Sequence, residues 1–304
     1  MSSLTDPDLA RKSLLYRRSI LRWIKHAGAG HTGGSLSCVD ILNVLYNRIL
    51  RVSPATFADP KRDRYVQSKG HSVEALFVVL ADRGFFPEGE LERLCGYDSH
   101  FVGHPTRKVP GVEQNTGALG HGLPISVGMA LASKMDQAGF RVFTLLGDGE
   151  LAEGSNWEAA MAAAHYRLEN LTAIVDCNTL QITGRTRDVM NHEPLAEKFA
   201  AFGWAVREVD GHDLAALTSA LEVPLASDRP GVVIARTVKG KGVSFMEDVG
   251  KWHHGVPSDD EYARALTEID AALAKLEHED GAPSPRRSAT SATGAPSLQN
   301  SLHA

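Results

Sequence analysis

Apolar residues in the first part of the chain recur with the period of α-helices. Leu14, Leu21 and Ile24 fall on one face of a helix. Pro7 suits the first turn of this helix and Gly28 suits its end. Two further stretches predict buried helices, over residues 38–50 and 72–83, and residues 120–137 predict a helix of small residues after a glycine-rich loop.

From residue 140 the pattern changes to short, β-rich apolar runs that alternate with helices. Residues 141–146 and 171–177 read as two strands joined by a helix, which together form a βαβ unit. Two more runs, 204–210 and 231–237, flank another helical stretch and repeat the alternation. The chain is therefore predicted to be α/β, a mostly parallel sheet with helices on both faces.

Composition indicates a soluble globular protein with a full core. Of 304 residues, 43% are apolar, and the longest apolar run, residues 75–81, is far shorter than a membrane span. Residues 1–7 lack a signal-peptide pattern. Cys38, Cys95 and Cys177 form no CxxC pair, so we expect buried free thiols and a cytoplasmic protein.

Charge and low complexity divide the chain into two parts. Residues 258–280 carry eight acids against two bases, whereas the rest of the body is near neutral, which argues against a nucleic-acid surface. In residues 281–304, 17 of 24 residues are Gly, Ala, Pro, Ser or Thr. We predict one domain over residues 1–280 and a disordered tail over 281–304.

Two polar residues follow the first two predicted strands. Asp148 comes after the first strand and Asn178 after the second. Because the carboxyl ends of parallel strands meet at one edge of a sheet, these oxygen ligands suit Mg²⁺. Gly147 and Gly149 let the backbone approach a phosphate closely. Taken alone, GDG is equally typical of a simple turn at a strand end.

The wider sequence resembles the thiamine-diphosphate binding motif, in which GDG precedes an Asn by about thirty residues. It is similar to transketolase in particular. The similarity includes GHTGGSLS from Gly30, DRYVQSKGH from Asp63, GHPTRKVPGVEQNTGALGHG from Gly103 and WHHG from Trp252. With further stretches it extends from about residue 10 to residue 278. The resemblance implies the thiamine-diphosphate-binding fold and its diphosphate-binding domain.

This resemblance implies a site for thiamine diphosphate with Mg²⁺, or with another divalent cation such as Ca²⁺. The metal ligands that it implies are the side chains of Asp148 and Asn178 and the backbone carbonyl of Leu180. The cofactor-binding residues that it implies are His71, Gly117, Ala118, Leu119, Gly149, Glu153, Asn178 and His254.

It also implies a set of catalytic residues. His31 and His104 match histidines that reach the hydroxyls of a ketose donor. His254 matches a histidine that contacts the cofactor's phosphates or the substrate. Glu153 and Glu158 match carboxylates that share protons between paired active sites. A sugar donor presents many hydroxyls, and imidazoles can donate, accept and titrate near neutral pH.

Residue types alone leave simpler roles open. We expect surface or packing roles for His26, His165 and His212, and no clear duty for His253. Taken alone, Glu153 could equally cap a helix.

Two positions depart from the family pattern. Glu74 stands where a small or apolar residue is usual, and His121 stands where glutamine is usual. These departures bear on which sugar fits rather than on the class of chemistry.

A single-chain transketolase is about twice this length, and the pyrimidine-binding half is absent here. The resemblance therefore implies the amino-terminal subunit of a split transketolase in an α2β2 assembly with a carboxy-terminal subunit, inactive alone. Such an enzyme transfers a two-carbon ketol unit from a ketose phosphate to an aldose phosphate, as in the pentose phosphate pathway. Symmetric assemblies are the rule for soluble oligomers.

Two alternatives remain open. One is a subunit of another thiamine-diphosphate enzyme, either 1-deoxyxylulose-5-phosphate synthase-like or of the 2-oxo acid dehydrogenase alpha type. The other is a non-catalytic binding relative that keeps the fold. Glu153 and His104 favour transketolase over the first, and intact Asp148 and Asn178 argue against the second.

Overall fold

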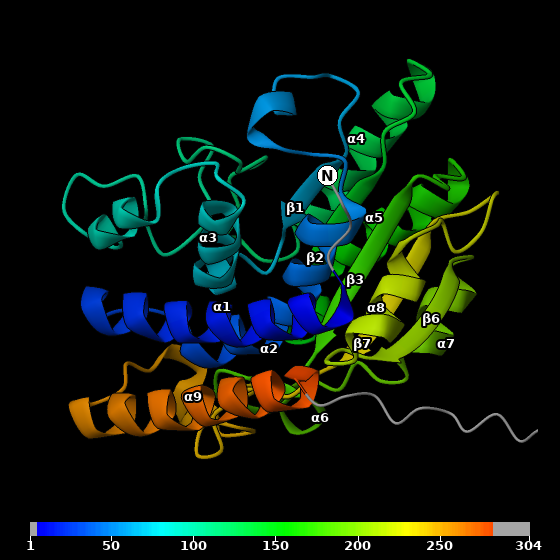
Figure 1. Cartoon of the computed structure of the whole chain (residues 1–304). Helices are drawn as coiled ribbons and strands as arrows, with labels where there is room; N and C mark the ends of the chain where they lie inside the picture. The colour runs from blue at the N-terminus through cyan, green and yellow to red at the C-terminus, as the bar shows by residue number, and fades with distance from the viewer. Residues whose placement is uncertain (1–4, 282–304) are drawn as a thin grey trace, which may run out of the picture.

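The computed structural model describes residues 5–281 and is built around a five-stranded parallel sheet in the order β1-β2-β3-β7-β6 (Figure 1). A short antiparallel hairpin of β4 and β5 forms a separate sheet. The strands are β1 (Arg64–Gln67), β2 (Val142–Gly147), β3 (Leu171–Cys177), β4 (Leu180–Gln181), β5 (Gly184–Arg185), β6 (Ala205–Asp210) and β7 (Gly231–Arg236).

Helices cover both faces of the sheet. The helices are α1 (Asp6–Ala27), α2 (Thr32–Val44), α3 (Val73–Asp82), α4 (Gly122–Met135), α5 (Gly154–His165), α6 (Thr186–Val189), α7 (Leu195–Ala201), α8 (Leu214–Leu221) and α9 (Asp259–Gly281). Ile174 of β3 packs into a core with α1, α2, α3, α8 and α9, whereas Ala173 and Val175 pack into a core with α4, α5 and α7. Successive strand residues thus point to opposite faces, and the predicted α/β class is confirmed.

The four predicted strands are confirmed as β2, β3, β6 and β7, but the sequence analysis missed β1. This strand has only four residues, RYVQ, and polar side chains occupy both of its ends. It is recognisable only through its parallel pairing with β2, in which Arg64 is paired with Val142 and Gln67 with Leu145.

Helix α2 begins at Thr32 rather than at residue 38, which corrects the prediction. Gly33 and Gly34 lie inside the helix instead of before it. A Cβ atom at Gly33 would lie 2.9 Å from the backbone oxygen of Trp252, so this glycine allows close packing. The predicted end at residue 50 is reached through a π-helical turn, Leu45–Ile49.

The cysteines are free, and two of the three match the expectation. Cys38 and Cys177 are buried, whereas Cys95 is exposed because it lies in a surface turn with a positive φ of 55°. Within residues 5–281 no helix is long and apolar enough to cross a membrane. Helix α9 includes Gly281, the first residue of the predicted tail, and residues 282–304 lie outside the described part.

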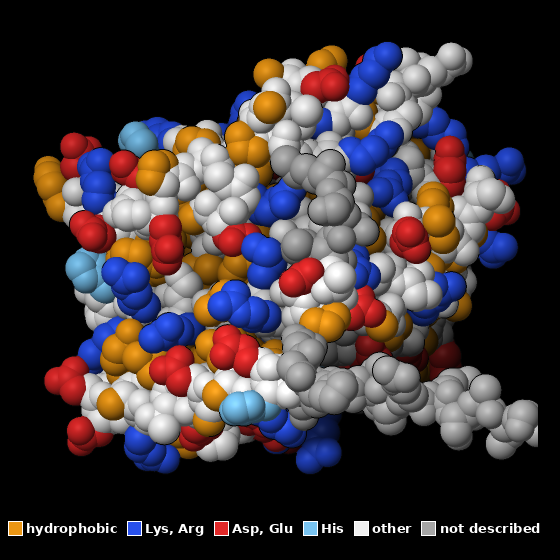
Figure 2. Space-filling view, in the orientation of Figure 1, with side chains coloured by type: hydrophobic (Ala, Val, Ile, Leu, Met, Phe, Trp, Pro, Cys, Tyr) orange, Lys and Arg blue, Asp and Glu red, His pale blue; other side chains and the backbone are white. Residues whose placement is uncertain are grey.

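Helix α9 lies beside α1, the first helix of the fold (Figure 1). Three ion pairs connect them in antiparallel order: Arg11–Glu277 at 3.9 Å, Arg18–Asp270 at 3.4 Å and Lys25–Asp259 at 2.7 Å. On the face that Figure 2 shows, acidic and basic side chains are mixed rather than segregated.

Candidate functional site

A pocket of about 260 Å³ lies at the carboxyl edge of the sheet, where β1, β2 and β3 end. Ligands bind at this edge in parallel α/β sheets. Nine residues that the sequence analysis selected line it: His31, His71, His104, Gly117, Leu119, Asp148, Gly149, Asn178 and Leu180. The fold therefore brings together most of the predicted site.

Asp148 and Asn178, which follow β2 and β3, both line this pocket. The Asp148 carboxylate accepts hydrogen bonds from the backbone N–H groups of Gly149 at 2.8 Å and Thr179 at 2.6 Å. Burial, with the nearby Asp176 carboxylate, raises the pKa of Asp148 to about 6. A buried carboxylate with no cation in contact is suited to receive one.

The donor set fits a magnesium ion held jointly by protein and ligand. Asp148, Asn178 and the Leu180 carbonyl present oxygen atoms, which Mg²⁺ prefers. No group of three or more His, Cys, Asp or Glu side chains within residues 5–281 could hold a metal ion. An ion held by these atoms would take the rest of its coordination shell from phosphate oxygens and water.

A buried ion pair that the sequence analysis missed supports the strand ends. The Lys69 ammonium contacts the Asp176 carboxylate, the Gly34 carbonyl at 3.1 Å and the Ser37 hydroxyl at 3.2 Å. Lys69 and Asp176 are buried, and the lysine holds the pKa of Asp176 below its usual range despite that burial. Lys69 also lines the pocket, so it places positive charge there.

A second buried lysine, Lys239, was also missed. It follows β7, and its ammonium donates to the Leu180 carbonyl at 3.1 Å and lies 2.8 Å from Nδ1 of His253. Burial, with the charge of Lys69, lowers the pKa of Lys239 to about 7. This lysine therefore lies directly beside the carbonyl that we predict to bind the metal.

Five histidines from four stretches of the chain form a cluster over the pocket: His31, His71, His104 and the adjacent His253 and His254. The ring centroids of His31 and His254 are 4.6 Å apart, those of His31 and His104 are 6.1 Å apart, and His71 stacks on His253 at 5.2 Å. Burial lowers the pKa of His31 to about 4 and that of His253 to about 3. Nδ1 of His31 is buried and has no hydrogen-bond partner within residues 5–281. Such an atom requires a water or a ligand group.

Comparison with known proteins places this site in a family. Residues 15–272 match the transketolase, thiamine diphosphate binding domain family. The chain belongs to the transketolase family. The family predicted from the sequence is confirmed, and this domain is the one that binds thiamine diphosphate.

Relatives of similar length exist in bacteria. An apulose-4-phosphate transketolase subunit of Phocaeicola vulgatus is 46% identical over 265 residues, which cover 87% of this chain and 94% of that protein. The 6-deoxy-6-sulfo-D-fructose transketolase subunit SqwG of Clostridium sp. is 39% identical over 86% of this chain and 96% of that protein.

Solved transketolases share the fold. Transketolase from Pichia stipitis in complex with sedoheptulose-7-phosphate superposes with a TM-score of 0.81 and 27% identity, over 90% of this chain. The match covers 44% of that chain, so this chain spans less than half the length of the solved transketolase.

Four of the residues selected by resemblance to transketolase lie outside the pocket lining. Ala118, Glu153, Glu158 and His254 are exposed. Glu153 precedes α5 as its N-cap residue without a side-chain capping bond. His254 still contacts His31, whereas its neighbour His253, which had no predicted duty, lines the pocket. The roles predicted for these four residues stay predictions.

Glu150 is a buried carboxylate of the GDGE sequence that we did not select. It accepts hydrogen bonds from the N–H groups of Gly120 at 2.9 Å and Gly147 at 3.0 Å, and it contacts the Ser68 hydroxyl. It therefore ties the loop around Gly117 to the end of β2. The sequence feature that could have identified Glu150 is its position two residues after Asp148.

The two departures from the transketolase pattern differ in their surroundings. Glu74 is buried and accepts hydrogen bonds from the backbone N–H of His31 at 3.0 Å and from the Ser35 hydroxyl at 2.7 Å. His121 is exposed and contacts the carbonyl oxygens of Ala118 and Leu119. Only Glu74 therefore acts on a predicted catalytic residue.

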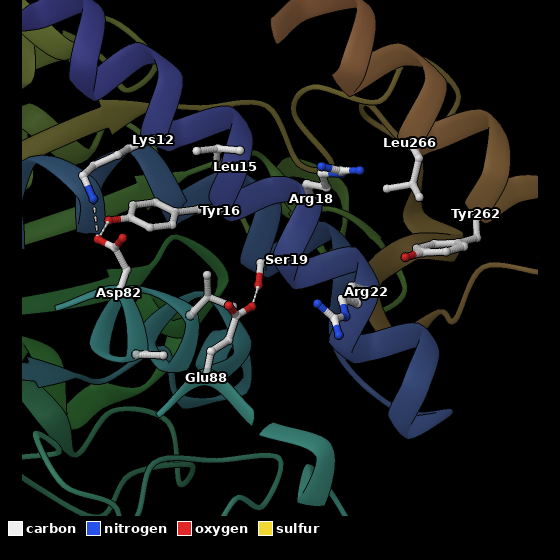
Figure 3. A pocket seen from close by; sticks show the side chains of 12 residues that line it. Lys12, Leu15, Tyr16, Arg18, Ser19, Arg22, Asp82, Glu88, Tyr262 and Leu266 are labelled. Atoms are coloured by element: carbon white, nitrogen blue, oxygen red, sulfur yellow. Dashed lines mark hydrogen bonds and ion pairs between the residues drawn. The ribbon is translucent and has the colours of Figure 1, made fainter. Parts of the chain in front are cut away.

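A larger cavity, about 500 Å³, lies between α1, α3 and α9 and contains none of the selected residues (Figure 3). Lys12 and the Tyr16 hydroxyl both donate to Asp82 at 2.6 Å, and Ser19 donates to Glu88 at 2.8 Å. Because its acids are already paired with local donors, this cavity offers no reactive arrangement.

Proposed function

We propose that this chain is the amino-terminal subunit of a two-chain transketolase that transfers a two-carbon ketol unit from a ketose phosphate to an aldose phosphate. The observation that carries the proposal is the juxtaposition of an oxygen donor set at Asp148 and Asn178 with a cluster of histidines. When bound, thiamine diphosphate supplies a thiazolium that accepts the electron pair released as the ketose carbon–carbon bond breaks.

In this proposal the strand ends hold the cofactor's diphosphate and a divalent cation. Asp148, Asn178 and the Leu180 carbonyl bind Mg²⁺, or Ca²⁺ in its place. On binding, the backbone N–H of Gly149 exchanges its hydrogen bond to Asp148 for one to the diphosphate, while the cation takes over the Asp148 carboxylate. The ammonium groups of Lys69 and Lys239 add positive charge. The raised pKa of Asp148 supports this assignment because a bound cation would stabilise its charged form.

The histidines orient the sugar and move protons. His31 and His104 face the ketose hydroxyls, and the unpartnered Nδ1 of His31 supports a hydrogen bond to substrate. His71 and His254 contact the diphosphate or the substrate. A neutral imidazole can both donate and accept a proton, and burial keeps His31 neutral at physiological pH.

The partner is a carboxy-terminal subunit that covers this pocket and binds the aminopyrimidine together with the loop of residues 117–119. We propose an α2β2 complex in the cytoplasm, in which Glu153 and Glu158 connect paired sites. The exposure of both glutamates supports contact with another chain. Relatives of similar length whose names describe them as transketolase subunits support the two-chain arrangement.

The names of the relatives indicate which sugars to test. By their names, two relatives act on apulose-4-phosphate and on 6-deoxy-6-sulfo-D-fructose. Sugars of the pentose phosphate pathway are therefore one substrate set to test beside these two.

The test is to purify the tagged chain from its host, identify the stoichiometric partner by mass, and assay both chains with a ketose, an aldose, Mg²⁺ and thiamine diphosphate. We expect ketol transfer that needs both chains and both cofactors. Turnover of pyruvate instead would favour the synthase-like or dehydrogenase-like alternative. Cofactor binding without turnover beside the partner would favour a binding relative.

A further inference from the structure

The loop that follows β7, residues 238–242, carries Lys239 into the pocket, and we call it the Lys239 loop. Two of its glycines have positive φ values, 81° at Gly240 and 94° at Gly242. A Cβ atom at Gly242 would lie 2.7 Å from Cδ of Arg17. The loop is therefore shaped to lie directly against the Arg17 side chain.

His212 binds the start of this loop. Its Nε2 accepts a hydrogen bond from the backbone N–H of Val238 at 2.9 Å, and its Nδ1 lies 2.8 Å from the Asp40 carboxylate. Because the Val238 N–H can only donate, Nε2 carries no proton and Nδ1–H donates to Asp40. Both ring nitrogens are thus committed, and the tautomer is fixed.

Asp40 connects His212 to the other end of the loop. Arg17 grips this buried carboxylate through two nitrogens, at 2.9 and 2.6 Å, and its Nε donates to the Lys241 carbonyl at 2.9 Å. One chain of hydrogen bonds therefore runs from Val238 through His212, Asp40 and Arg17 to Lys241. Paired fork contacts of this kind fix geometry as well as charge.

We propose that His212 is a positioning residue that, with Asp40 and Arg17, holds Lys239 at its place in the pocket. The chain of hydrogen bonds binds the backbone on both sides of Lys239. Arg17 and Asp40 belong to the packed helices α1 and α2. The Lys239 side chain then reaches the Leu180 carbonyl and His253. The link between this position of Lys239 and the binding of thiamine diphosphate rests on the proposed function above.

Two substitutions of His212 separate positioning from packing. In His212→Asn the amide falls near the Nδ1 position, so it keeps a donor for Asp40 but loses the acceptor for Val238. In His212→Gln the amide reaches the Nε2 position and keeps that acceptor. The readouts are the rate of amine labelling at Lys239 and the affinity of the two-chain complex for thiamine diphosphate with Mg²⁺. The labelling rate is taken from the high-pH plateau of its pH profile, so that a change in the lysine pKa does not enter, with the exposed Lys61 as internal reference.

For His212→Asn we expect Lys239 to label at least about threefold faster relative to Lys61 as the loop opens locally. We expect thiamine diphosphate to bind about tenfold more weakly, as for other residues that support a ligand's neighbours, with an unchanged KM for the ketose. His212→Gln should restore much of both. Unchanged labelling in folded His212→Asn would overturn the proposal.

If His212→Asn does not fold, Arg17→Lys provides the same test, because it keeps a cation beside Asp40 and removes the donor to Lys241. Faster labelling in Arg17→Lys would support the positioning role, and an unchanged rate would overturn it. Faster labelling with unchanged cofactor affinity would support the positioning role and contradict the part of the proposed function that places Lys239 at the diphosphate.

Discussion

Two buried aspartates at opposite ends of the parallel strands have opposite electrostatic surroundings. Asp63, before β1, accepts backbone N–H groups from Arg51 at 3.0 Å and Arg141 at 2.9 Å and pairs with both guanidinium groups. These partners outweigh burial and hold the pKa of Asp63 below its usual range. Asp148, after β2, accepts only backbone donors in the part of the chain that the structure describes, and its pKa is raised.

The difference distinguishes a structural carboxylate from one that awaits a ligand. Asp63 has its full complement of positive charge within the fold, so nothing further has to bind there. Asp148 is equally buried but touches no cation within residues 5–281. Burying a charge without a partner is costly, and it is tolerated where binding supplies the partner.

The largest expected effect comes from Asp148→Asn. In the two-chain enzyme it should lower thiamine-diphosphate-dependent ketol transfer at limiting Mg²⁺ by at least about a hundredfold, since even indirect support of a metal is worth 10–100-fold. The free energy of unfolding of the isolated, metal-free chain should rise at pH 7, because the substitution removes a buried charge that has no cationic partner within residues 5–281. Asp63→Asn is the matched control, with near-normal activity per folded molecule. Full activity in Asp148→Asn would contradict the assignment of Asp148 as a metal ligand.

Asp63→Asn should instead reduce stability. Removing one partner of a buried ion pair costs roughly 3–5 kcal/mol, and the exposed side of Arg51 reduces this to about 2 kcal/mol. Urea unfolding of the isolated chain measures the loss. Asp136→Asn, at an exposed position, should change the unfolding free energy little. Equal stability of the two variants would contradict the structural role of Asp63.

Lowering the pH should reduce the free energy of unfolding through His31 and through Asp63, but over different pH ranges. An unfolded histidine binds a proton near pH 6.5, whereas folded His31 does so near 4, so the unfolding free energy falls as the pH falls between these values. Asp63 has a lowered pKa, so its contribution is lost only below about pH 3.9.

Urea unfolding at pH 7 and pH 5 tests this difference. From pH 7 to pH 5 the unsubstituted chain should lose about 1 kcal/mol more than His31→Gln. Asp148 has a raised pKa and an effect of opposite sign, but it is common to both proteins. His165→Gln, at an exposed histidine, should behave like the unsubstituted chain. Identical pH slopes for all three would refute the buried, neutral state of His31.

The smallest effect is expected for Glu74→Gln. Glutamine keeps an acceptor for the His31 N–H but weakens it, because a charged acceptor binds about twice as strongly as a neutral one. We expect the KM for the ketose to rise by about two- to fivefold, with kcat nearly unchanged. Glu90→Gln, at an exposed position, is the control. A fall in kcat without a change in KM would mean that Glu74 acts on the chemical step.

The sequence predicted the part of the site that depends on strand order. Asp148 and Asn178 directly follow two strands of one βαβ unit, so their meeting needs only the geometry of parallel sheets. The fold class and four of the five sheet strands followed from the same patterns, whereas the family followed from the resemblance of the sequence motifs to transketolase. The domain boundary and the individual residue roles stay predictions.

Lys69, Asp176 and Lys239 escaped prediction because their burial depends on distant partners. Lys69 and Asp176 are 107 residues apart in sequence, and a lysine is normally expected at the surface. Likewise, His253 and His254 are adjacent, and only the turn that carries them decides which one lines the pocket. His212 seemed a packing residue because Asp40 and Val238 lie 172 and 26 residues away.

The pairing of α1 with α9 has a consequence for biosynthesis. The ion pairs from Arg11 to Glu277 and from Lys25 to Asp259 join the first helix of the fold to its last. During translation α1 emerges early, but its packing partner is made more than 200 residues later. The layer that α1 and α9 build can therefore close only after the ribosome has synthesised α9, and until then the face of α1 that packs on α9 stays exposed on the nascent chain, where chaperones can bind it.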